Sequence, residues 1–581
     1  MVRQFANLCV FSILISLFSC SGNSTEESSY LQTEAAIEEG EQLFSQHCAS
    51  CHNFNQALIG PNLSGVTQEV SHDWLSKFIV NAPEVIQSGD ERATKLYEQY
   101  KQYMPPFSML KAEEVEAILA YINTYQEIPE QSVTEFNEED ALEDPIPQKI
   151  EDSGLTLIIE KILQAPHSAD EGIRARINRM VEIQQNGKKR TFINDLRAKL
   201  YEVRDGKFHV FMNMQEMKPN FMNHPGWGSG LAHFEFHPEF EKNGLFYTSH
   251  TEKPGSAPAD FTYDDSIKVT VQYVLTEWKM DDPGATSFAG SQREIFRADM
   301  VTQVHGVQDI NFNPTAQPGD DDYGLLYIGV GDGGSAFGRF PFLCRDKSKI
   351  WGSVLRIDPL GNNSANGQYG IPEINPWVNE PDALGEVLCH GFRNPHHFMW
   401  SPSGETLYVT DIGQHQIEEI NIVKPGGDYG WPIREGTFMI STSGKANHVY
   451  PLPAKDTEEL IYPVVQYDHD EGNAIIGGMV YQGDQLPQLK GKLIFGDIVS
   501  GRLFYTNPDD FQLGQQAPVY SLNLKVKNQS DTTSFQTLGA AQRVALRFAT
   551  STEHEVYLFT KVDGAIYKAV GCEENKLASS H

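Results

Sequence analysis

The stretch Gly404-Glu405-Thr406-Leu407-Tyr408 places a tight turn directly before an aromatic-bearing strand, and this pattern sets the fold of most of the chain. Five other stretches repeat it, beginning at Gly206, Gly244, Gly324, Gly491 and Glu555. Short β-prone runs bounded by turn residues are typical of an all-β domain. Six such units within residues 153–571 predict a six-bladed β-propeller, with long inserted loops explaining the uneven spacing. A sandwich is the alternative fold, but about 420 residues is long for one sandwich.

The region before these repeats has a different periodicity. Residues 35–44 combine helix formers with apolar residues at helical spacing. Residues 112–125 place four apolar side chains on one face of a helix, namely Val115, Ile118, Leu119 and Ile122. We therefore expect a multidomain chain in which a small all-α domain, residues 34–125, precedes the all-β propeller.

Length and charge limit the classes of function. The chain has 581 residues, which is too long for one ordinary core. Its 78 acidic residues against 45 Lys and Arg give a formal net charge of -33. Because such an acidic surface repels phosphate backbones, we expect no nucleic-acid partner. After the N-terminus no segment has ~18 uninterrupted apolar residues, which excludes a polytopic membrane protein.

The first residues have the pattern of an export signal. Arg3 precedes an apolar run, residues 10–18, that is short for a membrane span. The ending Leu17-Phe18-Ser19-Cys20 resembles a bacterial lipobox, so we expect residues 1–19 to be removed and Cys20 to carry lipid. A plain secretory signal is the alternative. The predicted location is the periplasm or cell envelope, with this lipid as the only membrane contact.

Three further segments have the composition of a tether, a tail and a linker rather than of domains. Residues 20–33 form a Ser/Thr/Glu-rich tether, and residues 572–581 form a tail. Residues 126–152 carry ten acids against Lys149 alone, together with three prolines, which predicts a solvated acidic linker. Outside the signal and the CxxC pair the cysteines are Cys344, Cys389 and Cys572. Export is compatible with a Cys344–Cys389 disulfide, although the sequence does not fix which cysteines pair.

The strongest chemical signal is Cys48-Ala49-Ser50-Cys51-His52. Two thiols at this spacing can form thioethers to haem vinyl groups, while the adjacent His52 ligates the iron. A redox dithiol or half a zinc site are the alternatives, but no second CxxC and no βαβ pattern accompany it. The motif therefore predicts covalent haem c on Cys48 and Cys51.

Residues 34–125 resemble a class I cytochrome c. The resemblance rests on the helix leading to the haem motif, Gly60-Pro61-Asn62-Leu63, Met104-Pro105-Pro106-Phe107 and a final amphipathic helix. It implies that Met104 is the sixth iron ligand, where a thioether raises the haem potential. Met109 and His72 are the competing ligands, and a core-filling Met104 is the plainer alternative.

The long domain resembles the glucose/sorbosone dehydrogenase family, whose members are quinoprotein sugar dehydrogenases with six-bladed propellers, over roughly residues 155–570. The order and spacing of several segments carry the resemblance, and these are Gly230-Leu231, His237-Pro238-Glu239-Phe240, His305-Gly306, Asn311-Phe312, residues 328–334, residues 391–395, Glu419-Ile420-Asn421 and residues 427–432. The resemblance implies pyrroloquinoline quinone (PQQ) as cofactor, a sugar or other alcohol as substrate, and an external electron acceptor.

The resemblance also implies roles for individual residues. His305 would be the general base, although Gly306-Val307-Gln308-Asp309 replaces the family's usual Gly-Gly-Arg context. Arg393 and Asn394 would lie beside the quinone, and Asp332 matches an acid after a Gly-rich strand end. A structural His, an Arg that bridges blades and an ordinary Gly-Asp-Gly-Gly turn are the alternatives.

The family also holds calcium near its quinone. By resemblance the ligands here would be the carbonyls of Gly413, Gln414 and Tyr429, with the carboxylates of Glu418 and Glu419. Such oxygen donors suit a hard cation. Acids are abundant throughout this chain, so a purely structural role is the alternative.

Departures from the family pattern fall on the quinone-binding cations. Val499 stands where the family has Lys, Ala545 replaces the second Arg of an Arg-x-Arg pair that begins at Arg543, and Gly228 replaces a polar residue. PQQ has three carboxylates, so losing two cations weakens its binding. Arg502 and Arg547 could compensate for these cations. Trp227 could stack on a planar cofactor, and a place in the core is the alternative.

Two functions follow from these observations. In the first, an exported dehydrogenase oxidises a sugar, alcohol or aldehyde and passes the electrons from the quinone to its own haem. In the second, the propeller is a non-catalytic, calcium-stabilised binding module joined to an electron-carrying cytochrome. The haem, His305, Arg393 and Asn394 favour the first, whereas the missing cations favour the second.

Overall fold

The computed structural model describes most of the chain. The described residues are 30–48, 52, 54, 60–100, 104–126, 138–170, 172–224, 228–263, 267–336, 340–440, 448–453, 456 and 458–574. The predicted signal segment with Cys20, the second haem cysteine Cys51 and the candidate stacking residue Trp227 lie outside them. Within these ranges, no helix combines the length and apolar character that a membrane crossing requires.

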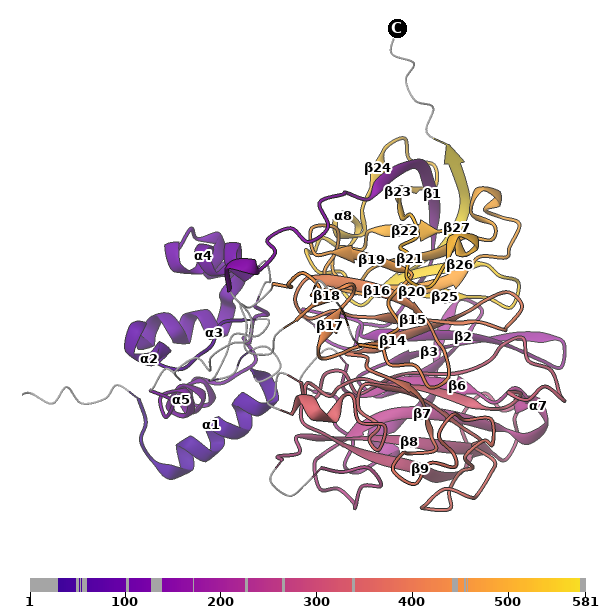
Figure 1. Ribbon diagram of the computed structural model, residues 1–581, viewed down its shortest axis with the longest axis horizontal. Helices are drawn as coiled ribbons and strands as arrows, with labels where there is room; N and C mark the ends of the chain where they lie inside the picture. The colour runs from indigo at the N-terminus through magenta and orange to yellow at the C-terminus, as the bar shows by residue number, and fades with distance from the viewer. Residues whose placement is uncertain are drawn as a thin grey trace, which may run out of the picture.

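The N-terminal region is helical, as the sequence predicts, and lies beside the propeller (Figure 1). Its helices are α1 (Glu34–His47), α2 (Val66–Glu69), α3 (His72–Gln87), α4 (Glu91–Tyr100) and α5 (Ala112–Ile122). Side-chain caps define where α1 and α3 begin, because Thr33 Oγ1 accepts the Ala36 N–H and Ser71 Oγ accepts the Trp74 N–H.

The first and last helices cross at a glycine. A Cβ atom on Gly40 would lie 1.9 Å from the Ala117 carbonyl oxygen, so only glycine allows α1 to approach α5 this closely. Around this crossing the helices enclose an apolar cluster that includes Phe44, Cys48 and Ile118. The haem-motif end of α1 therefore opens into an apolar interior.

The rest of the chain forms six four-stranded antiparallel blades, which confirms the predicted propeller. The blades, each in spatial order, are β2 (Ile177–Gln185), β3 (Lys188–Asp195), β4 (Lys199–Arg204), β5 (Lys207–Asn213); β6 (Leu231–Phe236), β7 (Leu245–Glu252), β8 (Val271–Met280), β9 (Gly290–Met300); β10 (Val307–Phe312), β11 (Leu326–Val330), β12 (Ser353–Ile357), β13 (Val387–His390); β14 (Pro395–Trp400), β15 (Leu407–Asp411), β16 (Ile417–Ile422), β19 (Val465–Asp468); β20 (Ile475–Val480), β21 (Leu493–Asp497), β22 (Leu503–Thr506), β23 (Tyr520–Val526); and β25 (Leu546–Thr550), β26 (Val556–Thr560), β27 (Ala565–Glu574), β1 (Glu151–Gln164).

The N-terminal strand closes the ring. β1 pairs antiparallel with β27 and so becomes the outer strand of the sixth blade. It also pairs in parallel with β23 of the fifth blade, and Figure 1 shows it between these two strands. Leu157 and Ile159 of β1 are fully buried, which anchors the closure in the core. This contact joins residues more than 400 positions apart in the sequence.

The repeated turn–strand units mostly mark one position in the blade. Five of the six units fall on the second strands β7, β11, β15, β21 and β26, whereas the unit at residues 206–210 falls on β5, the last strand of its blade. The second strand of that blade is β3, which follows the turn at Gly187. Hairpins throughout a blade use the same turn residues. The pattern therefore indicates that a strand is present but not which position it has in its blade.

The second half of the predicted solvated linker lies against the propeller. Leu142 bridges to Val449, and the Ile146 N–H donates to Asp468 Oδ2 at 3.1 Å. Lys149 forms an ion pair with Asp470 at 2.6 Å. These contacts hold residues 138–150 along the fourth blade, while residues 127–137 lie outside the described part.

The expected Cys344–Cys389 disulfide is wrong, because both side chains are buried free thiols. Cys389 belongs to β13 and packs in a cluster with Phe392. Cys344 belongs to another cluster, where its Sγ lies 3.3 Å from Ser335 Oγ. The expectation rested on the compartment, which permits a disulfide without bringing two cysteines together.

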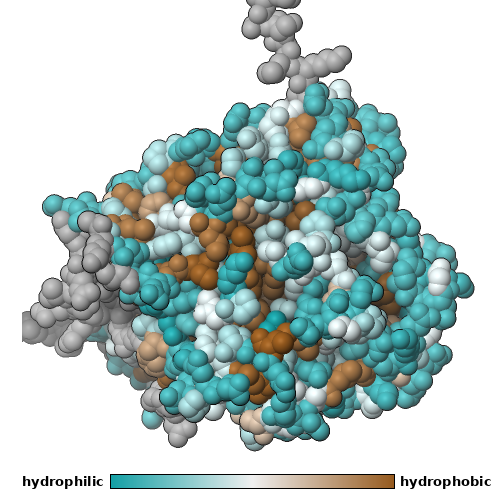
Figure 2. All heavy atoms as spheres, turned by 45° about the vertical axis from the view of Figure 1, so that its right-hand side comes forward, coloured by the Kyte–Doolittle hydropathy of each residue, from teal (hydrophilic) through white to brown (hydrophobic). Residues whose placement is uncertain are grey.

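The surface agrees with the acidic composition. Figure 2 shows a mainly hydrophilic face on which apolar side chains gather in a band near the middle. The core itself is divided into clusters between adjacent blades, such as the one formed by the second and third blades around Tyr273 and Trp351.

Candidate active site

The first strands of the blades surround the central channel. β2, β6, β10, β14, β20 and β25 contact one another in a closed ring. Because every blade repeats the same up-and-down order, these strands all begin at one end of the channel. The residues just before or at these starts include Arg176, His305, Arg393 and Arg543. Polar and charged residues from distant parts of the sequence thus lie near the same end of the channel.

His305 and Asp332 form a hydrogen-bonded pair at this mouth. His305 Nδ1 lies 2.7 Å from Asp332 Oδ1. Asp332 is itself held, since the Gly334 N–H donates to Oδ1 at 2.8 Å and the Trp431 Nε1–H donates to Oδ2 at 3.1 Å. Because Asp332 accepts a hydrogen bond from the Nδ1–H group, Nε2 of His305 is left as the basic nitrogen.

The charges around the pair favour neutral histidine. Burial and the positive charge of Arg393 lower the pKa of His305 below 6.5, against the opposing effect of Asp332. Burial alone would raise the pKa of Asp332, but its contacts with His305, Arg393 and the Gly334 N–H lower it overall. The site therefore combines an ionised carboxylate with an unprotonated imidazole at neutral pH.

Arg393 and Asn394 lie next to this pair on the fourth blade. The Arg393 guanidinium donates to Gln414 Oε1 and to the Ile412 carbonyl, and it lies 5.7 Å from the Trp431 ring centre. Both backbone N–H groups of Arg393 and Asn394 donate to Asp411. Asn394 Oδ1 is buried without a hydrogen-bond partner. A buried acceptor of this kind fits a ligand hydroxyl that donates to it.

The arrangement brings together the four residues that the resemblance implied, His305, Asp332, Arg393 and Asn394. A neutral imidazole, a fixed cation and an unsatisfied acceptor can remove a hydroxyl proton and stabilise the charge that forms. Sequence reasoning missed Trp431, which holds Asp332. Its signal was present in residues 427–432, but the motif did not indicate which side chain the indole contacts.

Two of the expected calcium ligands, the carboxylates of Glu418 and Glu419, do not come together. Glu418 and Glu419 are successive residues of β16, so they point to opposite faces of the blade. Glu418 accepts from the Ile475 N–H and contacts His469, while Glu419 accepts from the Gly436 N–H and the Asn421 amide. Among the described residues, no group of three or more His, Cys, Asp or Glu side chains could hold a metal ion. Glu418 and Glu419 therefore cannot both ligate one calcium ion, whereas the roles of the Gly413, Gln414 and Tyr429 carbonyls stay a prediction.

A buried glutamate shapes this loop instead. Glu435 accepts the backbone N–H groups of the four consecutive residues Gln414, His415, Gln416 and Ile417 at 2.6–3.0 Å. Burial would raise its pKa, but His415 and these amides lower it overall. Glu435 thereby fixes the loop that presents Gln414 to Arg393. No motif in the sequence points to this role of Glu435.

The candidate quinone cations occupy different environments. Arg502 donates to Glu471 at 2.6 Å and its side chain is 41% exposed. Arg543 precedes the inner strand β25 by three residues. At Gly228, a Cβ atom would lie 3.3 Å from Gln308 Nε2, so the Gln308 amide fills part of the space where the family has a polar side chain.

The described part of the haem motif has the chemistry of an iron site. The His52 N–H donates to the Cys48 carbonyl, which closes the turn of the motif. His52 Nδ1 lies 2.9 Å from the Pro61 carbonyl, so Nδ1 carries the proton and Nε2 can ligate iron. Burial lowers the pKa of His52, which keeps it neutral. These features fit haem; Cys51 lies outside the described residues.

The three candidate sixth ligands differ in their surroundings. Met104 packs against the apolar cluster of the helical domain. His72 Nε2 lies 2.7 Å from Glu116, and Met109 is 65% exposed. Met104 remains the predicted ligand, because its thioether already borders the interior in which haem would lie.

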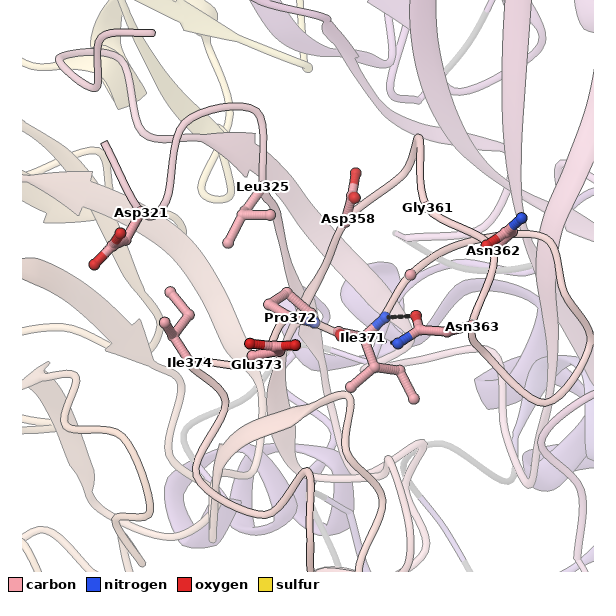
Figure 3. Close-up of a pocket in the computed structure, with 11 residues that line it drawn as sticks. Asp321, Leu325, Asp358, Gly361, Asn362, Asn363, Ile371, Pro372, Glu373 and Ile374 are labelled. Carbon is pink, nitrogen blue, oxygen red and sulfur yellow. Dashed lines mark hydrogen bonds between the residues drawn. The ribbon is translucent and has the colours of Figure 1, made fainter. Parts of the chain in front are cut away.

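A pocket elsewhere on the propeller lacks this chemistry. It has a volume of about 470 Å³ and lies beside the loop at residues 358–374. Figure 3 shows the carboxylates of Asp321, Asp358 and Glu373 around it, with Asn363 bonded to Ile371. It combines no base with a cation, so the channel mouth is the better candidate for an active site.

Comparisons with known proteins agree with both domains. The family model described as Glucose / Sorbosone dehydrogenase matches residues 181–528, and the cytochrome c model matches residues 37–126. The chain is 28% identical to aldose sugar dehydrogenase YliI of Escherichia coli over 30% of its length and 42% of that protein. It is 24% identical to quinoprotein glucose dehydrogenase B of Acinetobacter calcoaceticus, over 40% of this chain and 45% of that protein.

Other relatives carry different names. The HIPL1 protein of Arabidopsis thaliana is 26% identical over 46% of this chain and 42% of its own length, so the chain spans less than half of these curated relatives. Among solved structures, the apo form of the soluble aldose sugar dehydrogenase from Escherichia coli aligns with a TM-score of 0.50 and 18% identity. That alignment covers 72% of this chain and all of the other, and it supports the propeller fold alone.

Proposed function

Because the chain belongs to the glucose/sorbosone dehydrogenase family and carries a cytochrome c domain, we propose that it oxidises a sugar or a related alcohol or aldehyde and transfers the electrons to its own haem c. The His305–Asp332 pair beside Arg393 is the observation that supports this most strongly. The export signal and haem motif support a location outside the cytoplasm, from which an external carrier takes the electrons.

His305 acts as the general base in this proposal. Its Nε2 accepts the hydroxyl proton of the substrate, while Asp332 stabilises the imidazolium that forms. Arg393 stabilises negative charge on the reacting oxygen, and Gln414 holds its guanidinium in place. Asn394 accepts a hydrogen bond at Oδ1 and so orients the bound group.

The same residues suit a bound quinone. His305, Arg393 and Asn394 would contact it, and a quinone there would accept a hydride while the haem would carry electrons singly. Calcium has no assigned step in this proposal, since Glu418 and Glu419 point to opposite faces of the blade.

Contacts between the helical domain and the propeller support the cytochrome as the acceptor. Glu41 of α1 forms an ion pair with Lys268 of the propeller at 2.8 Å. Burial lowers the pKa of His47, which lies at the end of α1 next to Cys48. The charge of His224 contributes a smaller part of this decrease. His224 lies in the loop before the second blade. These contacts support a route from the channel mouth to the haem.

A binding module remains the second candidate. Val499 and Ala545 occupy positions where the family has cations, and one relative, human hedgehog-interacting protein, is 26% identical over 46% of this chain. In this alternative the haem would be reduced by another protein, and the propeller would bind a partner without chemistry.

Haem absorbance separates the two functions. Purified mature protein is titrated with PQQ and then given a panel of sugars, alcohols and aldehydes. We expect haem reduction that requires both quinone and substrate and that the matched variant His305→Ala abolishes. Quinone binding without haem reduction by any substrate would overturn the dehydrogenase, and full reduction in His305→Ala would remove its role as base.

A further inference from the structure

Basic side chains gather on the channel wall formed by the sixth and first blades, and they are Arg176, Arg543, Arg547 and Lys561. The backbone brings them together. The Ala175 N–H donates to the Lys561 carbonyl at 3.2 Å, and the Lys561 N–H donates to the Ala545 carbonyl at 3.4 Å. The Arg547 Nε–H donates to Asn178 Oδ1 at 3.0 Å, which ties the sixth blade to the first.

These cations are buried and influence one another. Lys561 is 2% exposed, Arg176 7% and Arg547 9%. Burial and the charges of Arg547, Arg176 and Arg543 hold the pKa of Lys561 well below its usual range, although Asp195 acts in the opposite direction. Burial, with Arg543, lowers the pKa of Arg547 to about 9. Buried cations that repel one another are stabilised by an anion placed among them.

Hydrogen bonds connect one member of the cluster, Arg176, to the backbone just before His305. The Arg176 guanidinium donates to the carbonyl of Ser229, beside Gly228. The Tyr273 hydroxyl then joins Gly228 to the carbonyl of Gln303, two residues before His305. The path from Arg176 to the proposed base therefore runs along the channel mouth.

His396 lies close to both the cluster and the candidate active site. It lies at the start of β14, two residues after Asn394, and its Nδ1 is buried without a hydrogen-bond partner. Burial and the charges of Arg547, Lys561 and His305, among others, hold the pKa of His396 well below its usual range. The charges of the cationic cluster and of the candidate active site thus both act on His396, and the buried atoms His396 Nδ1 and Asn394 Oδ1 have no hydrogen-bond partner.

The position of Lys561 suggests what it replaces. Ala545, where the family has its second arginine, is buried and carries no charge. Lys561 follows β26 directly and is bonded to Ala545 through the backbone. A cation on the neighbouring strand therefore stands next to the position from which the family's cation is missing.

We propose that Arg176, Arg543, Arg547 and Lys561 form a carboxylate-binding wall that holds the acid groups of a planar aromatic cofactor against His305 and Asn394. This inference rests on the proposed function and adds to it the residues that bind the cofactor. The cations are supplied by the sixth and first blades, in place of the lysine absent at Val499 and the arginine absent at Ala545. Charge-assisted hydrogen bonds to carboxylates supply the affinity.

Calorimetric titration of the full-length protein tests the wall. The probes are PQQ and benzene-1,3,5-tricarboxylate, which has three carboxylates and no redox chemistry. We expect Lys561→Gln to weaken the binding of both by roughly 10- to 100-fold and Lys561→Arg to retain it. Lys218→Gln is the matched control, because Lys218 is a half-buried lysine that stacks on Trp278 away from the channel. Arg543→Gln, at a half-buried position, is the second variant should Lys561→Gln fail to fold.

The outcomes separate the wall from the proposed function. If PQQ binds the wild type and both glutamine variants equally, the wall is wrong and the dehydrogenase stands. If the tricarboxylate binds through Lys561 or Arg543 but PQQ does not bind, the wall stands and the quinone-dependent function falls. If neither probe binds the wild type, both are wrong.

Discussion

At the scale of single residues, the site depends on one histidine in a costly backbone conformation. His305 has a φ of +53°, in the left-handed region that favours glycine. Gly331 beside it has no room for a side chain, since a Cβ atom would lie 2.4 Å from the His305 carbonyl oxygen. Backbone strain at a residue that also bonds a buried carboxylate is typical of a functional position.

The pH dependence of oxidation should follow His305. Protonated His305 cannot accept a proton, so kcat/KM falls as pH drops through its pKa, which burial and Arg393 place below 6.5. Arg393→Gln removes one of the lowering charges, so the pKa rises and the acid limb of the profile moves to higher pH. Arg393→Lys, which keeps the charge, is the control. An unmoved limb in Arg393→Gln would show that another group titrates.

Replacing Asp332 tests the orientation of the same ring. In Asp332→Asn the amide can donate to Nδ1, which moves the imidazole proton to Nε2 and removes the basic nitrogen from the substrate. We expect kcat to fall by about 10²- to 10⁴-fold while KM changes little. Steady-state kinetics of haem reduction measures both values. A rise in KM with an unchanged kcat would contradict an orienting role for Asp332.

How far the sequence predicts the site differs between residues. His305, Asp332, Arg393 and Asn394 lie in recognisable segments, and the structure brings them together. The cation Lys561 escaped notice because no motif surrounds it and its proximity to Arg176 arises only when the ring closes. For Glu418 and Glu419 a usable signal existed, since adjacent residues of a strand point to opposite faces.

At the scale of elements, the sequence predicts strands and helices better than their partners. Turn residues count the strands of the propeller, because turn chemistry is local. The pairing of β1 with β27 could not be predicted in this way, since it depends on residues more than 400 positions apart. The contacts of residues 138–150 with the fourth blade could not be predicted from the sequence either, because their partners are also far away in the chain.

The closing strand should contribute much of the stability of the propeller. Ile159→Ala in β1 creates a cavity at a fully buried position and should lower the free energy of unfolding by about 2–5 kcal/mol. Ile162→Ala, three residues along the same strand at a position 40% exposed, should change it by less than about 0.5 kcal/mol. Urea unfolding followed by tryptophan fluorescence compares the two, and similar midpoints would indicate that β1 is not needed for closure.

At the helix crossing in the cytochrome domain, Gly40→Ala should destabilise the protein although helix propensity alone predicts a gain in stability. Gly40→Ala should stabilise an isolated helix by about 1 kcal/mol. Here the new methyl group meets the Ala117 carbonyl, so we expect a loss of about 1–3 kcal/mol instead. Thermal unfolding monitored at the haem Soret band measures the effect, with the exposed Glu38→Ala on the same helix as control. A more stable Gly40→Ala would mean that α1 and α5 can move apart.

At the scale of the whole molecule, fusion should make electron transfer intramolecular. The Glu41–Lys268 pair is largely exposed and contributes little stability by itself. The linker nevertheless keeps the haem at a high effective concentration near the channel mouth. The rate of haem reduction in the intact chain should therefore be independent of protein concentration.

Two inactive variants test this when they are mixed. His305→Ala keeps the haem but lacks the base, while the double variant Cys48→Ser/Cys51→Ser keeps the propeller but cannot attach haem. If transfer is intramolecular, the mixture with quinone and substrate should reduce haem much more slowly than the intact chain, at a rate proportional to the concentration of the haem-free partner. Both proteins carry a strongly negative net charge, so added salt should accelerate this intermolecular reaction by screening their repulsion. A mixture as fast as the intact chain would show that electrons pass between molecules and that fusion serves another purpose.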